Sequence, residues 1–324
     1  MNQEEFRKSN QHHWKQFKQL LDNLESRKKN NVVPHMDEFP HLYRKVCQQL
    51  DLARHRNYGS KLTEMLNDLV LRGHQFFYQS QAKKIGRFKK IFTQDFPRAV
   101  RKDIKLFWVA SFLFYGPFFF IIFLIYFSPE MVYSVIDPGT VKQMEEMYDP
   151  AKAHERGFSD DITMFGFYVY NNTGIGLKTF GSSLILGIGS IFTLAFNGIF
   201  IGAVFGHLYV EGMGVKLFPF VIGHSSFELT AIVISGMAGL KLGLAFIIPK
   251  DRTRREAIKI AGRECMPLIY GFVMMFFVAA FIEGFWSPIK ENIVSANIKY
   301  IVGACLWSLV VLYFIFVGRE QRVR

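Results

Sequence analysis

His224 and Glu228 are the residues of this chain best placed to do chemistry, because both lie inside a long apolar segment. Apart from these two side chains, residues 217–240 contain no ionisable group. A spacing of four residues puts both side chains on one face of a helix. A charged group in hydrocarbon costs about 2.5–3.5 kcal/mol. Another polar group must therefore compensate for Glu228, and the sequence predicts a polar site inside a membrane.

His207 extends this pair to a predicted cluster of three residues. It lies near the end of the uncharged segment 179–210, and His224 lies near the start of the next segment. We expect His207, His224 and Glu228 to meet between helices in the outer half of the membrane. There they either pin helices together by hydrogen bonds or bind a proton, an ion or a polar solute. No metal, cofactor or catalytic site is expected, since neither a His-Glu-x-x-His motif nor a cysteine cluster nor an oxyanion-stabilising group accompanies them.

Apolar segments of membrane-spanning length must position these residues. The uncharged runs 106–127, 265–282 and 300–318 each suit one crossing of a ~30 Å hydrocarbon core. Between residues 176 and 249 we expect three further crossings, at about 177–196, 198–213 and 217–248. The predicted fold is therefore all-α, a polytopic membrane protein with about six spans. The alternative has four full spans, with a re-entrant pair within 179–213.

The glycines of the central segment predict both a break and close packing. Asn197-Gly198 is typical of a chain reversal, where the asparagine side chain can bond freed backbone groups. Gly198, Gly202 and Gly206 recur every four residues, so they form one smooth helical face that a neighbouring backbone can approach.

Basic residues are distributed so as to orient the chain in the membrane. Residues 1–105 hold 22 Lys/Arg and 11 Asp/Glu, and the connection 249–264 holds six Lys/Arg, whereas 128–176 holds three Lys/Arg and eight Asp/Glu. The bias of Lys and Arg toward the cytoplasmic side places both termini in the cytoplasm and 128–176 outside, as an acidic external loop. We expect a cytoplasmic domain over 1–97 and a transmembrane domain over 98–324.

The cytoplasmic domain is predicted to be a basic helical bundle that ends in an interfacial helix. Its first helix carries an apolar stripe at three- and four-residue spacings, formed by Phe6, Trp14, Phe17, Leu20, Leu21 and Leu24. A basic run near the first span, interleaved with aromatic residues, suits the surface of an anionic inner leaflet. This run consists of Lys83, Lys84, Arg87, Lys89 and Lys90. Nucleic acid is not expected as a partner, because no nucleic-acid-binding motif is present.

The central segments resemble the stage II sporulation protein M family. The resemblance rests on Asn197-Gly198 with Gly202, then on residues 223–231 (Gly-His-Ser-Ser-Phe-Glu-Leu-Thr-Ala), and then on residues 239–243 (Gly-Leu-Lys-Leu-Gly). Members usually read Pro-His-Gly-x-x-Glu-Leu-x-Ala at the second motif. Gly223 and Ser225 depart from that pattern on either side of His224, so the start of this helix is expected to differ.

This resemblance implies a non-enzymatic scaffold of the bacterial inner membrane and cell envelope. In spore formers the family member resembles a scaffold that brings peptidoglycan hydrolases to the septum, and relatives are often encoded near RDD-domain membrane proteins. Both classes are thus implied partners, and a second copy of the chain is a further candidate. The acidic external loop and the basic bundle would be contact surfaces. The alternative function is a transporter or channel subunit that uses His224 and Glu228 as an intramembrane site.

Overall fold

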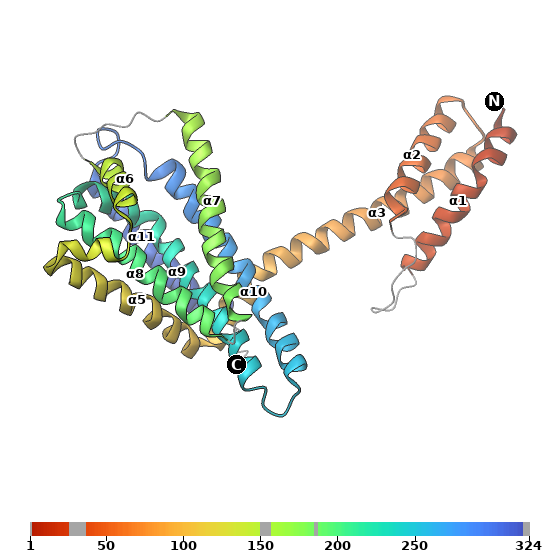
Figure 1. Cartoon of the computed structure of the whole chain (residues 1–324). Coiled ribbons are helices and arrows are strands. Elements are labelled where there is room, and N and C mark those ends of the chain that lie inside the picture. Colours follow the sequence, from red (N-terminus) through yellow and green to blue (C-terminus); the bar gives the residue numbers. More distant parts are fainter. Residues whose placement is uncertain (1, 26–36, 150–156, 185–186, 320–324) are drawn as a thin grey trace, which may run out of the picture. The chain divides into compact units, whose positions relative to one another are not determined.

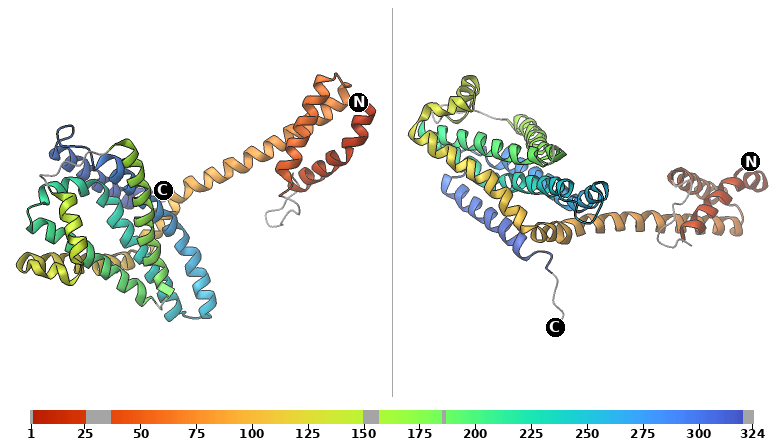
Figure 2. Two further views of the ribbon diagram at one scale, coloured as in Figure 1. Left: turned by 45° about the horizontal axis from the view of Figure 1, so that its top comes forward. Right: turned by 60° about the horizontal axis from the view of Figure 1, so that its bottom comes forward.

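All regular structure in the described part of the chain is helical (Figure 1; Figure 2). The computed structural model describes residues 2–25, 37–149, 157–184 and 187–319. This confirms the predicted all-α class. The chain divides into two compact units, Met1–Phe88 and Lys89–Arg324, and each is described by itself.

The N-terminal unit is a helical domain with its own core. It contains α1 (Gln3–Glu25), α2 (Phe39–His55) and most of α3 (Ser60–Lys90). The apolar stripe predicted for the first helix is buried along its whole length, against apolar side chains of α2 and α3. Trp14 donates a hydrogen bond from Nε1 to Oε1 of Gln49 at 2.6 Å, so the polar atom of this buried ring is satisfied. The buried core residues all lie between Phe6 and Leu69. This core therefore contains no residue of the second unit, the membrane unit.

The second unit contains the apolar helices. Its longer elements are α4 (Phe96–Lys102), α5 (Ile104–Phe127), α6 (Pro138–Tyr148), α7 (Phe158–Gly181), α8 (Ile188–Val210), α9 (Gly214–Ile247), α10 (Arg254–Phe281) and α11 (Ala296–Phe316). Short turns of other helix types join some of them: η1 (Ile91–Asp95), η2 (Pro129–Ser134), η3 (Ser182–Leu184) and η4 (Ile282–Trp286). Among the described helices, α5, α8, α9, α10 with η4, and α11 are long and apolar enough to cross a membrane.

Residues 128–176, predicted to form one loop, instead contain η2, α6 and most of α7. Helix α7 is 24 residues long and packs against α9 and α10. It was missed as a helix of the membrane unit because Asp160, Asp161 and Asn172 interrupt its apolar character. For the same reason, α7 is not one of the five helices that are long and apolar enough to cross a membrane.

Helix α9 is the centre of the membrane unit. It contacts α5, α7, α8, α10 and α11, and 67% of its most apolar window is buried, against 17% for α11 and 28% for α5. The other helices thus screen α9 from lipid. A polar side chain on a buried face of α9 meets protein rather than hydrocarbon, which is where intramembrane polar groups are found.

The helix break predicted at Asn197-Gly198 is wrong. Helix α8 runs without interruption from Ile188 to Val210, and Asn197 donates from Nδ2 to the carbonyl oxygen of Thr193, one turn earlier in the same helix, at 2.7 Å. The chain reverses instead between α7 and α8, where Gly187 has a φ of +75°. Glycine tolerates this left-handed conformation because it has no Cβ atom.

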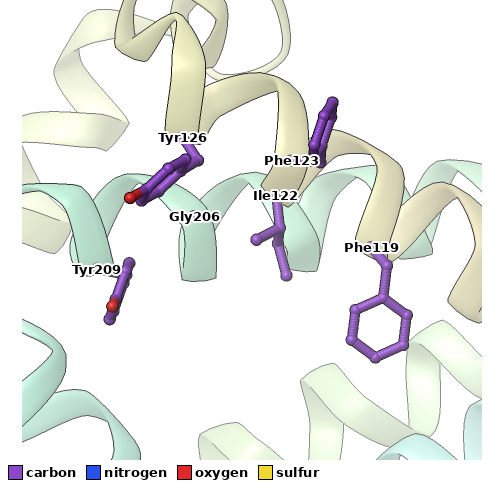
Figure 3. A pocket seen from close by; sticks show the side chains of 6 residues that line it. All are labelled: Phe119, Ile122, Phe123, Tyr126, Gly206 and Tyr209. Carbon is purple, nitrogen blue, oxygen red and sulfur yellow. The ribbon is translucent and has the colours of Figure 1, made fainter.

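Gly198, Gly202 and Gly206 bring α8 into close contact with α5. A Cβ atom on Gly198 would collide with the carbonyl oxygen of Phe114, and one on Gly206 would lie 3.2 Å from the Cα atom of Ile122. Beside this contact lies a shallow apolar hollow of about 250 Å³ (Figure 3). Its lining residues are Phe119, Ile122, Phe123, Tyr126, Gly206 and Tyr209. The rings of Phe119 and Phe123 are more than half exposed, so this apolar surface suits lipid.

Candidate functional site

His224 and Glu228 lie one turn apart on the central helix α9. The imidazole of His224 is buried, and its Nε2 atom lies 3.8 Å from Oε2 of Glu228. Helix α9 continues through both positions without a break, so the i, i+4 spacing places the two groups on one face, as predicted. This pair is the start of the candidate site.

Glu283 completes a group of three potential ligands. One donor atom each from His224, Glu228 and Glu283 can be chosen so that all three lie within 4.8 Å of one another. Glu283 lies in η4, a turn of π-helix that continues α10. Such turns displace side chains from the regular helical positions and are frequent at functional sites. The site therefore combines two elements that are far apart in the sequence.

Glu283 was missed in the sequence because it seemed to end a span. It follows the uncharged run 265–282 directly, and a charged residue at that place is typical of the start of a loop. The available signal was its surroundings: Phe281, Ile282, Phe285 and Trp286 keep the segment apolar on both sides of the carboxylate.

A second layer of polar groups orients the three side chains. Nδ1 of His224 lies 3.1 Å from Oγ of Ser287, and Asn172 of α7 donates from Nδ2 to Oε2 of Glu283 at 3.3 Å. Lys299 of α11 donates from Nζ to the carbonyl oxygen of Ser287 at 2.8 Å. When His224 donates its Nδ1 proton to Ser287, Nε2 carries a lone pair directed at the carboxylates. Four helical elements thus contribute to one polar centre.

His207 does not join this centre. Its Nε2 atom lies 2.7 Å from Oε1 of Glu145 in α6, and its ring packs edge-on against Tyr133. The reason is the packing of α8, whose neighbours include η2 and α6 as well as α5 and α9. The predicted three-residue cluster is therefore corrected: the third member beside His224 and Glu228 is Glu283, and His207 links α8 to the segment before α7.

A second charged network surrounds Lys241, near the other end of α9. Its Nζ atom lies 2.6 Å from Oδ2 of Asp103 and 2.7 Å from Oε2 of Glu264. Lys102 also contacts Glu264, at 3.0 Å. Nearby in the sequence, Arg101 donates to the carbonyl oxygens of Phe314 and Val317 at the end of α11. This network compensates every charge it contains, so we regard it as a structural tie between α5, α9 and α10.

The basic run predicted to contact the membrane surface lies at the end of α3. Arg87, Lys89 and Lys90 are exposed there. The side chains of Lys83 and Lys84 lie outside the described residues. Binding of this run to anionic lipid stays a prediction.

The His224–Glu228–Glu283 centre can bind a positively charged ligand. Two carboxylates this close together repel each other when both are ionised. Inside a membrane unit that repulsion is screened less than in water. A proton or a cation held between the two carboxylates removes it, and a neutral imidazole can add a nitrogen donor.

Comparison with known proteins places this centre inside a matched region. A family model described as "Stage II sporulation protein M" matches residues 108–288, a range that includes His224, Glu228, Glu283, Asn172 and Ser287. A domain of unknown function (DUF8413) matches residues 4–79, within the N-terminal unit. An uncharacterized protein of Methanocaldococcus jannaschii is 24% identical over 120 residues, which cover 36% of this chain and 67% of that protein. No solved structure matches the chain.

Proposed function

The chain belongs to the stage II sporulation protein M family, and on this basis we propose that it is a membrane scaffold that assembles other envelope proteins. The observation that carries the proposal is that the N-terminal unit has a buried core made of its own residues alone. A unit that needs no surface for its own stability can offer its charged faces to another protein. The family is not known to be enzymatic, and we propose no reaction for this chain.

Three exposed lysines on one face of α1 form the contact surface that we propose for this role. Lys8, Lys15 and Lys18 are exposed, and their spacings of seven and three residues place them on one side of the helix. Such a face attracts an acidic partner and speeds its association. Following the family resemblance, we propose an RDD-type membrane protein as the partner at this face, and a cell-wall hydrolase complex as a partner of the acidic segment 128–176 on the outer side.

We propose that both termini are cytoplasmic and that the protein resides in a bacterial inner membrane. The support is the basic composition of residues 1–105 and 249–264 against the acidic composition of 128–176. The basic end of α3 then approaches the anionic leaflet on the same side.

The test is partner capture from membranes in mild detergent, using the full chain. We expect a reproducible partner, and we expect the variant Lys8→Glu, Lys15→Glu, Lys18→Glu to capture much less of it. The matched control reverses the same number of charges elsewhere on the unit, at Arg54, Arg56 and Lys61, and should capture as much as the wild type. A wild-type protein that always purifies alone would contradict the scaffold.

The buried His-Glu-Glu centre favours a second candidate function, transport of a proton or a small cation. Intramembrane carboxylates that several helices enclose are frequent in ion pathways. In proteoliposomes, Glu228→Gln should then abolish proton or cation flux while the protein still elutes as a folded species. Flux that is absent in the wild type, or unchanged in the variant, would exclude this role.

A further inference from the structure

His224, Glu228 and Glu283 supply a donor set that suits one particular class of ion. The set has one imidazole nitrogen and two carboxylate oxygens, and the three donor atoms lie within 4.8 Å of one another. Bonds of about 2.1 Å to a common ion require donors roughly 3.4 Å apart in tetrahedral geometry. The glutamate carboxylates would have to approach by up to about 1.4 Å, the difference between these two separations.

The carboxylate of Glu228 is the donor group that hydrogen bonds leave open. Among the residues that the structure describes, Glu228 accepts no hydrogen bond; its contact with Nε2 of His224 is 3.8 Å long, beyond hydrogen-bond reach. The His224 side chain is 7% exposed, so water cannot easily replace the missing partner. An imidazole nitrogen 3.8 Å from one carboxylate, with a second carboxylate close by, is an arrangement that an ion would complete.

The surrounding groups hold the donors as ligands are held in metal sites. Nδ1 of His224 is 3.1 Å from the Ser287 hydroxyl, which fixes the ring and directs Nε2 inward. Asn172 restrains the Glu283 carboxylate from α7, and Asn171 donates to Oδ1 of Asn172 at 3.1 Å. Partners of this kind orient the ligands and tune affinity.

Charge and ligand type then select the ion. Two carboxylates and a neutral imidazole carry a charge of about −2, which a divalent cation balances inside a low-dielectric environment. Hard ions such as Mg²⁺ and Ca²⁺ prefer oxygen ligands alone, whereas imidazole suits first-row transition ions. We propose that His224, Glu228 and Glu283 bind one divalent transition-metal ion, Zn²⁺ or Mn²⁺, and that water completes its coordination. The proposal depends on neither the scaffold nor the transport function.

The experiment is metal analysis of the full chain purified with a histidine-free tag. After incubation with Zn²⁺ or Mn²⁺ and desalting, elemental analysis should find about one ion per chain. Because the rings of His12 and His13 lie 3.9 Å apart on the N-terminal unit, the measurement is made in a His12→Gln, His13→Gln background. Mg²⁺ should not compete at equal concentration.

Variants locate the ion. Glu228→Gln and Glu283→Gln should each weaken Zn²⁺ binding by more than tenfold, and Ser287→Ala by about tenfold through loss of orientation. The matched control is His207→Gln, which removes another buried histidine with a carboxylate partner and should leave binding unchanged. Binding that survives both glutamate substitutions, or that the wild type lacks, would overturn the proposal.

A measurement on the protein with all three ligand residues intact gives a result that misfolding of a variant cannot affect. X-ray absorption at the zinc edge should show one imidazole nitrogen with oxygen donors and no sulfur. A sulfur ligand would point to Cys265 or another cysteine and would refute the site, whatever the variants show.

Discussion

At the scale of single residues, Lys241 shows how a charge is retained inside a membrane helix. Its side chain is 10% exposed and contacts Asp103 and Glu264. Lys241→Met leaves the half-buried Asp103 without its cation, and removal of one partner from a fully buried pair costs about 3–5 kcal/mol. Because Asp103 and Glu264 are partly exposed, we expect the lower end of that range, measured as a clear fall in the thermal unfolding midpoint in detergent. Lys102→Met removes an exposed partner of Glu264 and should change stability by less than about 1 kcal/mol.

His13 gives a pH dependence to the N-terminal unit. Burial and the charges of Lys45, His12 and His41 lower the pKa of His13, and the Lys45 ammonium lies 2.8 Å from its Nε2 atom. The unfolded chain, with a histidine pKa of about 6.5, therefore takes up this proton before the folded chain does. Stability is full above that pH and falls as the pH drops through it.

We therefore expect faster amide exchange in peptides of α1 and α2 at pH 5.5 than at pH 7, after correction for intrinsic rates. His13→Gln should reduce this difference. His55→Gln, at the exposed end of α2, should keep it. Equal pH effects in both variants would show that His13 does not cause the dependence.

At the scale of elements, the face of α8 formed by Gly198, Gly202 and Gly206 sets the contact with α5. Gly198→Ala places a methyl group against the backbone of Phe114, which cannot rotate away. Overpacking of this kind costs about 1–3 kcal/mol, seen as a lower unfolding midpoint. The matched control is Gly174→Ala on α7, where a Cβ atom meets nothing within 4 Å. That variant should be neutral or gain up to about 1 kcal/mol from helix propensity.

Local patterns predicted some elements and misled at others for identifiable reasons. The apolar stripe of α1 and the His224/Glu228 pair depend on spacing within one helix, so both could be read from the sequence. Asn197-Gly198 resembled a turn, but its glycine serves a neighbouring helix, which no local pattern reports. The partners of Glu283 and Lys241 could not be read from the sequence because they lie on other helices: Glu283 meets residues of α7 and α9, and Lys241 meets Asp103 and Glu264.

At the scale of the whole membrane unit, contacts fix the relative directions of α5, α7 and α9. The start of α5 at Asp103 meets Lys241, late in α9, so α5 and α9 run in opposite directions. Gly187, after α7, packs against Gly243 of α9, while Gly284 meets Phe165 near the start of α7. Helix α7 therefore extends from the η4 end of the unit to the Lys241 end, parallel to α9. We therefore expect α7 to make a sixth crossing beside the five apolar helices, with its buried Asn172 turned toward Glu283 of η4.

This arrangement predicts on which side of the membrane each connection lies. After replacement of the three native cysteines, single cysteines at Gly181 and Arg252 should react with an impermeant reagent only from the cytoplasmic side. A cysteine at Met213 should react only from the outside, because an odd number of helices separates it from each of the other two positions. If α7 instead lay on the membrane surface, Gly181 would label only from the outside and Met213 only from the cytoplasmic side, because α8 still separates the two positions. That result would also remove Asn172 from the membrane interior, and with it one support of the polar centre around Glu283.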